Sequence, residues 1–458
     1  MTEKTIKLMK DTPVLRWTAL VLLASLMFFG YMFMDVLSPL QSLLESQRGW
    51  TPETYGTFCS SEYLLNVFAF FLIFAGIILD KMGIRFTILL SGGLMVLGAF
   101  IKYYAISDAF VGTSLEQSLS SWWPSFPASA KLASLGFMIF GCGVEMAGVT
   151  VSKAIVKWFK GKELALAMGI EMAIARLGVF AVFSLSPRIA QGIHIDKSVL
   201  FATLLLVIGF ICVTVYTLMD RKLDKQLGES GVVPDDPFRI SDIGKLFTSK
   251  TFLLVAFLCV LYYSAIFPFQ KFAANMLECR LGISNQAASD IFRWFPIGAM
   301  VLTPLLGGFL DTKGKGASIL IIGAVLMFVC HMIFALTPAE YFTPVVAYGA
   351  IVILGVSFSL VPAALWPSVP KLVENRYLGS AYSVIFWIQN IGLMAFPILI
   401  GWALAETNKG VVNPTDYNYT VPMLIFAGLG VLAFIFGIML KIEDKKKGYG
   451  LELPNIKK

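Results

Sequence analysis

Charged residues are scarce in this 458-residue chain. They account for 14% of it, whereas soluble domains carry about 25%. Histidine occurs only twice, and none of the six cysteines stands in a Cys-x-x-Cys pair, so no metal site or disulfide framework is visible. The net charge of +7 is too dilute for a surface that binds nucleic acid. These shortages exclude an ordinary soluble enzyme, a disordered chain and a nucleic-acid-binding protein, and we expect no cofactor.

Long apolar runs are what the sequence has in excess, since apolar residues make up 57% of it. A helix needs about 20 apolar residues to cross the hydrocarbon core of a membrane. Twelve runs of suitable length cover residues 15–39, 54–80, 86–107, 131–157, 163–191, 197–219, 251–278, 286–310, 317–337, 344–371, 377–405 and 420–441. The sequence therefore predicts an all-α membrane protein with twelve transmembrane helices.

The basic residues in the loops predict how the chain is oriented. With both termini in the cytoplasm, roughly 25 of the 36 basic residues lie on the cytoplasmic side. Few basic residues remain on the other side: Arg48, Arg188, Lys197, Arg280 and Lys409. We therefore expect a multi-pass protein of the plasma membrane, or of the inner membrane in a bacterium, with cytoplasmic termini.

A more polar segment divides the predicted helices into two sets of six. The predicted organisation is a first half over residues 1–219, a cytoplasmic linker over 220–250, a second half over 251–441 and a cytoplasmic tail over 442–458. Within the linker, Asp236-Pro237 is a helix-start signal, and the apolar spacing after it suits a short helix on the membrane face. A flexible linker is an equally good interpretation.

A short motif recurs in both halves, 231 residues apart. Its residues are Gly76, Asp80, Lys81, Gly83 and Arg85 in the first half, and Gly307 and Asp311 in the second. Two parallel six-helix halves that each carry this G-x-x-x-D motif resemble the major facilitator superfamily. The resemblance implies the major facilitator fold, a central cavity between the halves, and a conformational latch formed by the motif at the cytoplasmic end. Lys81 stands where arginine is commoner, so we expect a weaker latch.

Ionisable residues inside the predicted spans are costly and point to function. They are Asp35, Glu62, Glu145, Lys153, Glu171, Arg176, Lys271, Glu278 and Arg293. Glu62, Glu278 and Arg293 lie near helix ends, where positions at a cavity rim or snorkelling are expected. Lys153 and Glu171 lie at similar depths, and we expect them to neutralise each other as a structural brace.

Glu145 and Arg176 lie near the middle of spans four and five. Both are about 22–24 Å from the turn between these spans, at 1.5 Å per residue. An internal repeat maps them to Ser359 and Asn390 in the second half, so the fold does not require these charges. We expect the two side chains to face each other or a shared ligand. A buried structural ion pair is the alternative.

Aromatic and amide side chains in the second half suit a small amphipathic solute. The candidates are Tyr262, Trp366, Gln389 and Asn390. Pro268 interrupts span seven, and transporter sites often use broken helices. For any one of the aromatic side chains, packing against lipid or the core is the more frequent role.

Several stretches resemble more closely the lysosomal dipeptide transporter subfamily and its prokaryotic relatives. The clearest are Gly141-Cys-Gly-Val-Glu145, Trp158-Phe-Lys-Gly-Lys-Glu-Leu164 and Ala173-Ile-Ala-Arg176. The resemblance implies transport of short peptides by alternating access, with Glu145 at the ligand's ammonium group and Arg176 at its carboxylate. Arginine can hold a carboxylate through two parallel hydrogen bonds.

We therefore expect a secondary transporter of dipeptides, either a uniporter or proton-coupled. The candidate proton carriers are Asp35, Glu62 and Glu145, and Lys271 would shape the cavity from the second half. An enzyme is not expected, because no nucleophile–base or metal constellation occurs.

Two alternatives remain open. The cargo could be another organic anion or an amino acid, with Arg176 and Lys271 forming an anion site, or the protein could be a non-transporting membrane sensor or subunit. The expected partners are a small-molecule substrate and the lipid bilayer. The lysosomal relatives depend on an accessory protein, for which this sequence offers no support.

Overall fold

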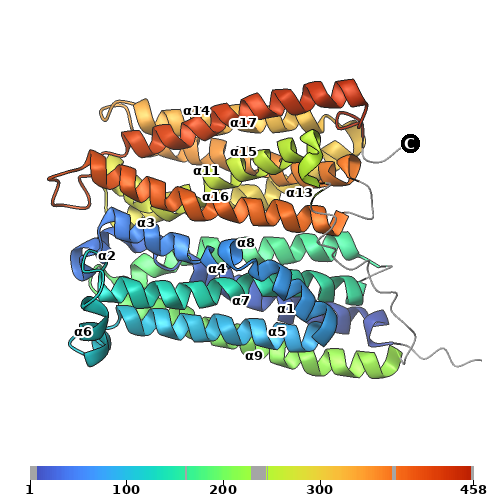
Figure 1. Ribbon diagram of the computed structural model, residues 1–458, viewed down its shortest axis with the longest axis horizontal. Helices are drawn as coiled ribbons and strands as arrows, with labels where there is room; N and C mark the ends of the chain where they lie inside the picture. The colour runs from blue at the N-terminus through green and yellow to red at the C-terminus, as the bar shows by residue number, and fades with distance from the viewer. Residues whose placement is uncertain (1–7, 160–161, 228–243, 245, 374–377, 455–458) are drawn as a thin grey trace, which may run out of the picture.

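The apolar runs form long helices that lie roughly parallel in two stacked bundles (Figure 1). The computed structural model describes residues 8–159, 162–227, 244, 246–373 and 378–454. All regular secondary structure in these residues is helical. Figure 1 shows the N-terminal helices, in blue and green, in one bundle, and the C-terminal helices, in yellow to red, in the other.

The first bundle is built from five long helices and several short ones. The long helices are α1 (Pro13–Met34), α5 (Phe71–Ile106), α7 (Ala128–Phe159), α8 (Leu164–Ala190) and α9 (Ile195–Leu227). The short helices are η1 (Met9–Asp11), η2 (Ser38–Leu40), α2 (Gln41–Arg48), α3 (Pro52–Ser61), α4 (Leu64–Phe68), η3 (Asp108–Phe110) and α6 (Ser114–Ser120). Because α9 continues to Leu227, it extends into the segment predicted as a linker.

The second bundle begins with α11 and contains seven described helices. They are α11 (Lys250–Leu281), α12 (Asn285–Phe292), α13 (Phe295–Lys313), α14 (Gly316–Leu336), α15 (Pro344–Leu372), α16 (Leu378–Thr407) and α17 (Thr420–Lys447). The short linker helix expected after Asp236-Pro237 lies outside the described residues for most of its length. The boundaries of the two halves therefore stay predictions.

The described residues contain eleven segments long and apolar enough to cross a membrane. The predicted second span, 54–80, is instead divided into α3, α4 and the beginning of α5. Helix α5 then passes through Gly83, which has a φ of 79° and a ψ of 170°, directly into the third span. Glycine adopts this backbone conformation without the strain that a side chain would cause, which explains the motif glycine at this sharp turn.

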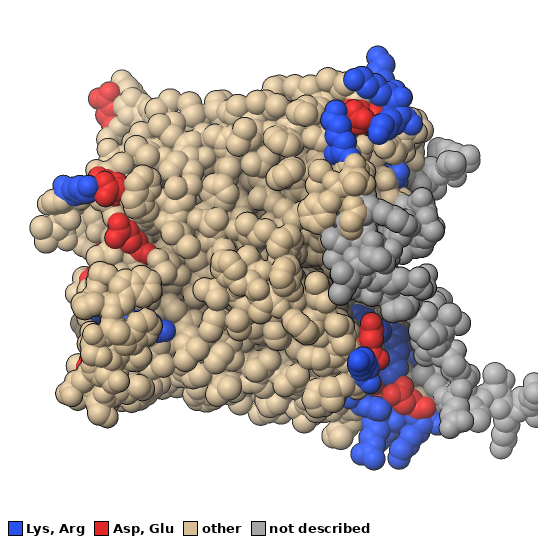
Figure 2. Space-filling model, viewed as in Figure 1, with Lys and Arg blue, Asp and Glu red and all other residues tan. Residues whose placement is uncertain are grey.

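On the face shown in Figure 2, the exposed charged side chains lie at the two ends of the molecule. Lysine and arginine gather at the end where α1 begins and α17 finishes, which we call the terminal end; the other end is the distal end. The band between them is free of charged groups on the face shown. This distribution matches a protein whose middle lies in hydrocarbon.

The two halves contact each other at the distal end. Ser60 in α3 donates a hydrogen bond to the carbonyl oxygen of Met394 in α16 at 2.6 Å. Arg188 in α8 forms an ion pair of 2.8 Å with Asp290 in α12. The distal end is therefore the closed end of the interface between the halves.

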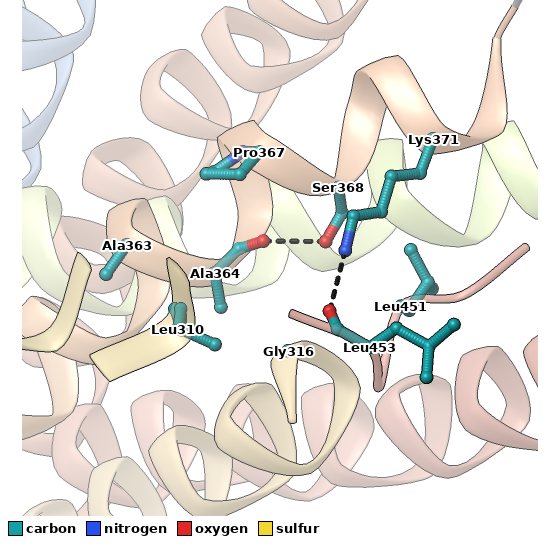
Figure 3. A pocket seen from close by; sticks show the side chains of 9 residues that line it. All are labelled: Leu310, Gly316, Ala363, Ala364, Pro367, Ser368, Lys371, Leu451 and Leu453. Carbon is teal, nitrogen blue, oxygen red and sulfur yellow. Dashed lines mark hydrogen bonds between the residues drawn. The ribbon is translucent and has the colours of Figure 1, made fainter. Parts of the chain in front are cut away.

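The C-terminal segment folds back onto the terminal end of the second bundle (Figure 3). Lys371 Nζ donates hydrogen bonds of 3.0 Å to the carbonyl oxygens of Gly450 and Leu453. The amide of Gly316, at the start of α14, donates to the carbonyl oxygen of Leu451 at 3.0 Å. The small pocket enclosed there has room for roughly one water molecule, too little for an organic substrate.

Candidate functional site

A break in the second predicted span positions Glu62. Helix α3 ends at Ser61 and α4 begins at Leu64, so Glu62 stands between two short helices and is 1% exposed. Helix α7 touches this break at Gly141, where a Cβ atom would lie 2.0 Å from the Glu62 carbonyl oxygen. The glycine in the stretch Gly141–Glu145 therefore allows α7 to contact the broken helix directly.

Lys271 in α11 joins the two halves through buried carboxylates. Its Nζ lies 2.9 Å from Asp35 Oδ1 and 3.6 Å from Glu62 Oε2. Gln270 donates a hydrogen bond of 2.6 Å to the other oxygen of Asp35, and Tyr55 donates one of 2.8 Å to the Lys271 carbonyl oxygen. We call Asp35, Glu62 and Lys271 the ion cluster. It crosses the interface with its lysine from one half and its carboxylates from the other.

Lys102, a buried lysine of α5, is not among the residues that the sequence predicted for the site. It is 0% exposed, and its Nζ has no hydrogen-bond partner. The ammonium group lies 4.1, 4.7 and 5.1 Å from the ring centres of Phe137, Phe33 and Phe58, which form an aromatic cage around it. The sequence does contain a signal for it, because a lysine at residue 102 falls within the predicted span 86–107.

Glu145 and Arg176 do not pair with each other. Glu145 is half-buried beside Asn390 of α16, and its main charged neighbour is Glu62. Nδ2 of Asn390 is buried and has no hydrogen-bond partner. The described residues contain no ion pair between Glu145 and Arg176, so the interpretation as a structural ion pair is wrong for this conformation. Their joint contact with a ligand stays a prediction.

Arg176 lies among aromatic rings from both halves. Its guanidinium carbon is 4.9 Å from the ring centre of Phe358, 5.5 Å from that of Phe267 and 6.0 Å from that of Tyr31. The acid that interacts with it is Glu171, on the same helix. A planar guanidinium stacks favourably on such rings and keeps its N–H edge available for a carboxylate.

The expected brace between Lys153 and Glu171 is wrong. Lys153 Nζ instead lies 2.6 Å from Oδ1 of Asp80, the motif aspartate at the terminal end. Arg85 of the same motif pairs with Asp224 of α9 at 2.9 Å. The first copy of the motif is therefore tied to α7 and α9 within its own half. Its role as a latch between conformations stays a prediction.

The remaining motif residues lie at the terminal end. Gly76 has open space around its Cβ position, and Lys81 is exposed. In the second copy, Asp311 contributes to the electrostatic environment of Lys371. The loop after Asp311 pairs with the C-terminal segment, since Lys315 donates its backbone amide to the carbonyl oxygen of Glu452 at 3.0 Å.

The predicted aromatic and amide candidates separate into two groups. Trp366 donates a hydrogen bond of 3.1 Å to Tyr263, whose ring centre lies 5.5 Å from that of Phe267 beside Arg176. Tyr262 is fully buried and donates instead to the backbone of α14, so it does not face the interface between the halves. Gln389 accepts from Cys259 of α11 at 3.2 Å, inside the second half. Tyr263 thus faces the site in place of Tyr262 and is, with Lys102, absent from the predicted candidates.

Lys162 and Glu163, just before α8, form ion pairs with the terminal ends of η1 and α1. Lys162 Nζ lies 2.5 Å from Asp11 Oδ1, and Arg16 lies 2.8 Å from the carboxylate of Glu163. The hydrogen bond from Lys162 holds the pKa of Asp11 below its usual value, so this aspartate remains charged well below neutral pH. These contacts give Lys162 and Glu163 a structural role.

A family model described as the Major Facilitator Superfamily matches the chain over residues 22–397 and again over 273–453. The chain belongs to the Major Facilitator Superfamily. It is therefore a multi-pass membrane protein of a transporter family, as the resemblance in the sequence implied, and its relatives are transporters rather than enzymes.

Among the curated relatives of this major facilitator protein are lysosomal dipeptide transporters of animals. The protein from Mus musculus is 30% identical over 283 residues, which cover 60% of this chain and 59% of the relative. The one from Homo sapiens is 28% identical over 346 residues, which cover 72% and 68%. The chain thus spans about three-fifths of the mouse protein's length in the match.

Solved structures of other superfamily members share the fold. A crystal structure of nucleoside transporter NupG has a TM-score of 0.66 at 15% identity and covers 92% of this chain and 99% of that one. A D-xylose-proton symporter has a TM-score of 0.66 at 14% identity and covers 93% and 97%. At these identities the likeness shows the fold alone.

Proposed function

We propose that this major facilitator protein transports short peptides, above all dipeptides, by alternating access. The observation that carries the proposal is the separation of Glu145 from Arg176. A carboxylate and a guanidinium lie near the interface of the halves without forming an ion pair together. Each can therefore meet a ligand group of opposite charge.

The chemistry of a dipeptide fits these surroundings. Its ammonium group would bind Glu145, with the side chain of Asn390 close by. Its carboxylate would accept two hydrogen bonds from Arg176. The rings of Phe267 and Phe358 beside Arg176 would take an apolar side chain.

The comparisons support the same cargo. Curated relatives with 28–30% identity carry the name lysosomal dipeptide transporter. The stretches of this chain that resemble their subfamily include both Glu145 and Arg176. The solved structures of a nucleoside transporter and a sugar symporter support the fold and leave the cargo open.

The alternative with another organic anion has less support. It needs Arg176 and Lys271 together in an anion site, yet Lys271 is engaged with Asp35 and Glu62. Transport could be uniport or coupled to protons. Of the candidate carriers, Glu62 has the best support for coupling, because it interacts with both Glu145 and Lys271.

We also propose that the terminal end faces the cytoplasm in a plasma or bacterial inner membrane. The support is the concentration of lysine and arginine at this end in Figure 2. The curated relatives are named as lysosomal, so an acidic internal membrane is the alternative location.

Uptake of a labelled dipeptide into liposomes that contain the purified protein tests the proposal. We expect Glu145→Gln and Arg176→Ala each to reduce uptake to background while the yield of folded protein stays near that of the wild type. The matched control is Glu53→Gln, an exposed glutamate of α3, which should transport normally. Undiminished uptake by either site variant, or no uptake by the wild type, would overturn the peptide assignment.

A further inference from the structure

Lys102 is an anomaly because its side chain is fully buried and its amino group has no hydrogen-bond acceptor. A hydrogen bond to an oxygen atom would lower the free-energy cost of burying this amino group, yet Nζ has no hydrogen-bond partner. The cage of Phe33, Phe58 and Phe137 compensates only in part, through the negative faces of the rings. A lysine kept in this state needs an explanation beyond packing, since methionine would fill the same space.

The charged residues near the aromatic cage suggest an explanation for the buried lysine. The ring of Phe137 has the Lys102 ammonium 4.1 Å from its centre and the Lys271 ammonium 5.4 Å from it. Lys102 and Lys271 of the ion cluster therefore share the ring of Phe137. Lys102 is attracted by Glu62 and Asp35 and repelled by Lys271. Neither side-chain oxygen of Glu62 has a hydrogen-bond partner, so Glu62 retains the capacity to accept.

The two lysines belong to different halves of the molecule. Asp35, Glu62, Lys102 and the three rings of the cage all lie in the first half, whereas Lys271 lies on α11 in the second. If the distal end opens, Lys271 withdraws with its half and leaves two carboxylates behind. Carboxylates that lose a buried partner are strongly unfavourable.

We propose that Lys102 is the exchange partner of the ion cluster: it leaves the aromatic cage to bind Asp35 and Glu62 when Lys271 withdraws, and it returns when the distal end closes. This role rests on the alternating access proposed above. Lys102 is thereby a positioning residue of the transport cycle, not a ligand of the substrate. Its long flexible stem allows the ammonium group to move between cage and carboxylates without a backbone change.

A distance measurement across the distal end tests this role without a substrate. Spin labels at Glu53→Cys in α3 and Lys409→Cys after α16 report its opening in liposomes, in a background without the native cysteines; both positions are exposed. We expect Lys102→Met to reduce the distal-open population roughly tenfold. Methionine suits the aromatic cage, so the variant should fold, and thermal unfolding checks this.

A second variant separates charge exchange from a packing effect. Adding Glu62→Gln to Lys102→Met removes one of the carboxylates that needs a partner, so the open population should return toward that of the wild type. An unchanged population in Lys102→Met, or an equal decrease in the single and double variants, overturns the role of Lys102. A wild-type protein that never opens at its distal end overturns both this role and alternating access. Failure of dipeptides to bind would instead affect the proposed cargo alone.

Discussion

At the scale of single residues, the surroundings of Lys271, Arg176 and Lys102 differ. Lys271 is paired with two carboxylates across the interface. Arg176 lies among three rings and next to Glu171. Lys102 has only the faces of its aromatic cage. These differences assign Lys271 to the contact between the halves, and they leave Arg176 as the cation with a guanidinium edge available for a ligand.

Removal of the Lys271 charge should destabilise the folded protein. In a Lys102→Met background, where the proposed exchange partner is absent, Lys271→Met leaves Asp35 and Glu62 buried without a cation, and breaking a buried pair in this way costs about 3–5 kcal/mol. Denaturant unfolding in detergent measures the loss. The control is Lys409→Met in the same background, because Lys409 forms only an exposed pair with Glu406 and should change stability by less than about 1 kcal/mol. Equal stabilities of the two variants would contradict the assignment of Lys271.

At this scale the sequence could not predict the direction in which a side chain points around its helix. Counting residues placed Glu145 and Arg176 at one level, and no pattern revealed that their side chains do not meet. Successive residues on a helix point about 100° apart, so Tyr263 faces the site while Tyr262 faces α14. Rotation depends on packing between helices far apart in sequence, which a single sequence does not display.

At the scale of helices, the broken second span is the feature that brings the site together. Residues 62–70 contain neither proline nor glycine, yet two breaks occur there, and Phe70 has a φ of 51°. The apolar run therefore predicted the existence of the span and gave no sign of its division. Contacts that fix the break, such as Gly141 against the Glu62 carbonyl, are tertiary.

The close contact between α3 and α16 also gives a prediction. A Cβ atom at Gly56 would lie 2.3 Å from the carbonyl oxygen of Pro397, so Gly56→Ala must force the two helices apart. Overpacking of this kind costs about 1–3 kcal/mol, and we expect a lower temperature of thermal unfolding. Gly428→Ala in α17 is the control, because nothing lies within 4 Å of its Cβ position. The same unfolding temperature for both variants would show that the contact is unimportant.

At the scale of the whole molecule, the two halves meet at the distal end around a site that draws on both of them. Glu145 and Arg176 come from the first half, and Asn390 and Phe358 beside them come from the second. The apolar runs and the repeated motif were enough to predict this fold. They were not enough to predict the ion cluster, which depends on how the halves dock.

Binding of end-blocked dipeptides tests the central claim, that Glu145 holds the ammonium group and Arg176 the carboxylate. The measurement is thermal stabilisation of the purified protein by a dipeptide, its N-acetylated form and its C-terminal amide. In the wild type, each blocking group should weaken binding by about 2 kcal/mol, the value of a charged hydrogen bond. In Glu145→Gln, acetylation of the dipeptide should not weaken binding further. In Arg176→Ala, amidation of the dipeptide should not weaken binding further. Equal stabilisation of the wild type by free and blocked dipeptides would contradict the account.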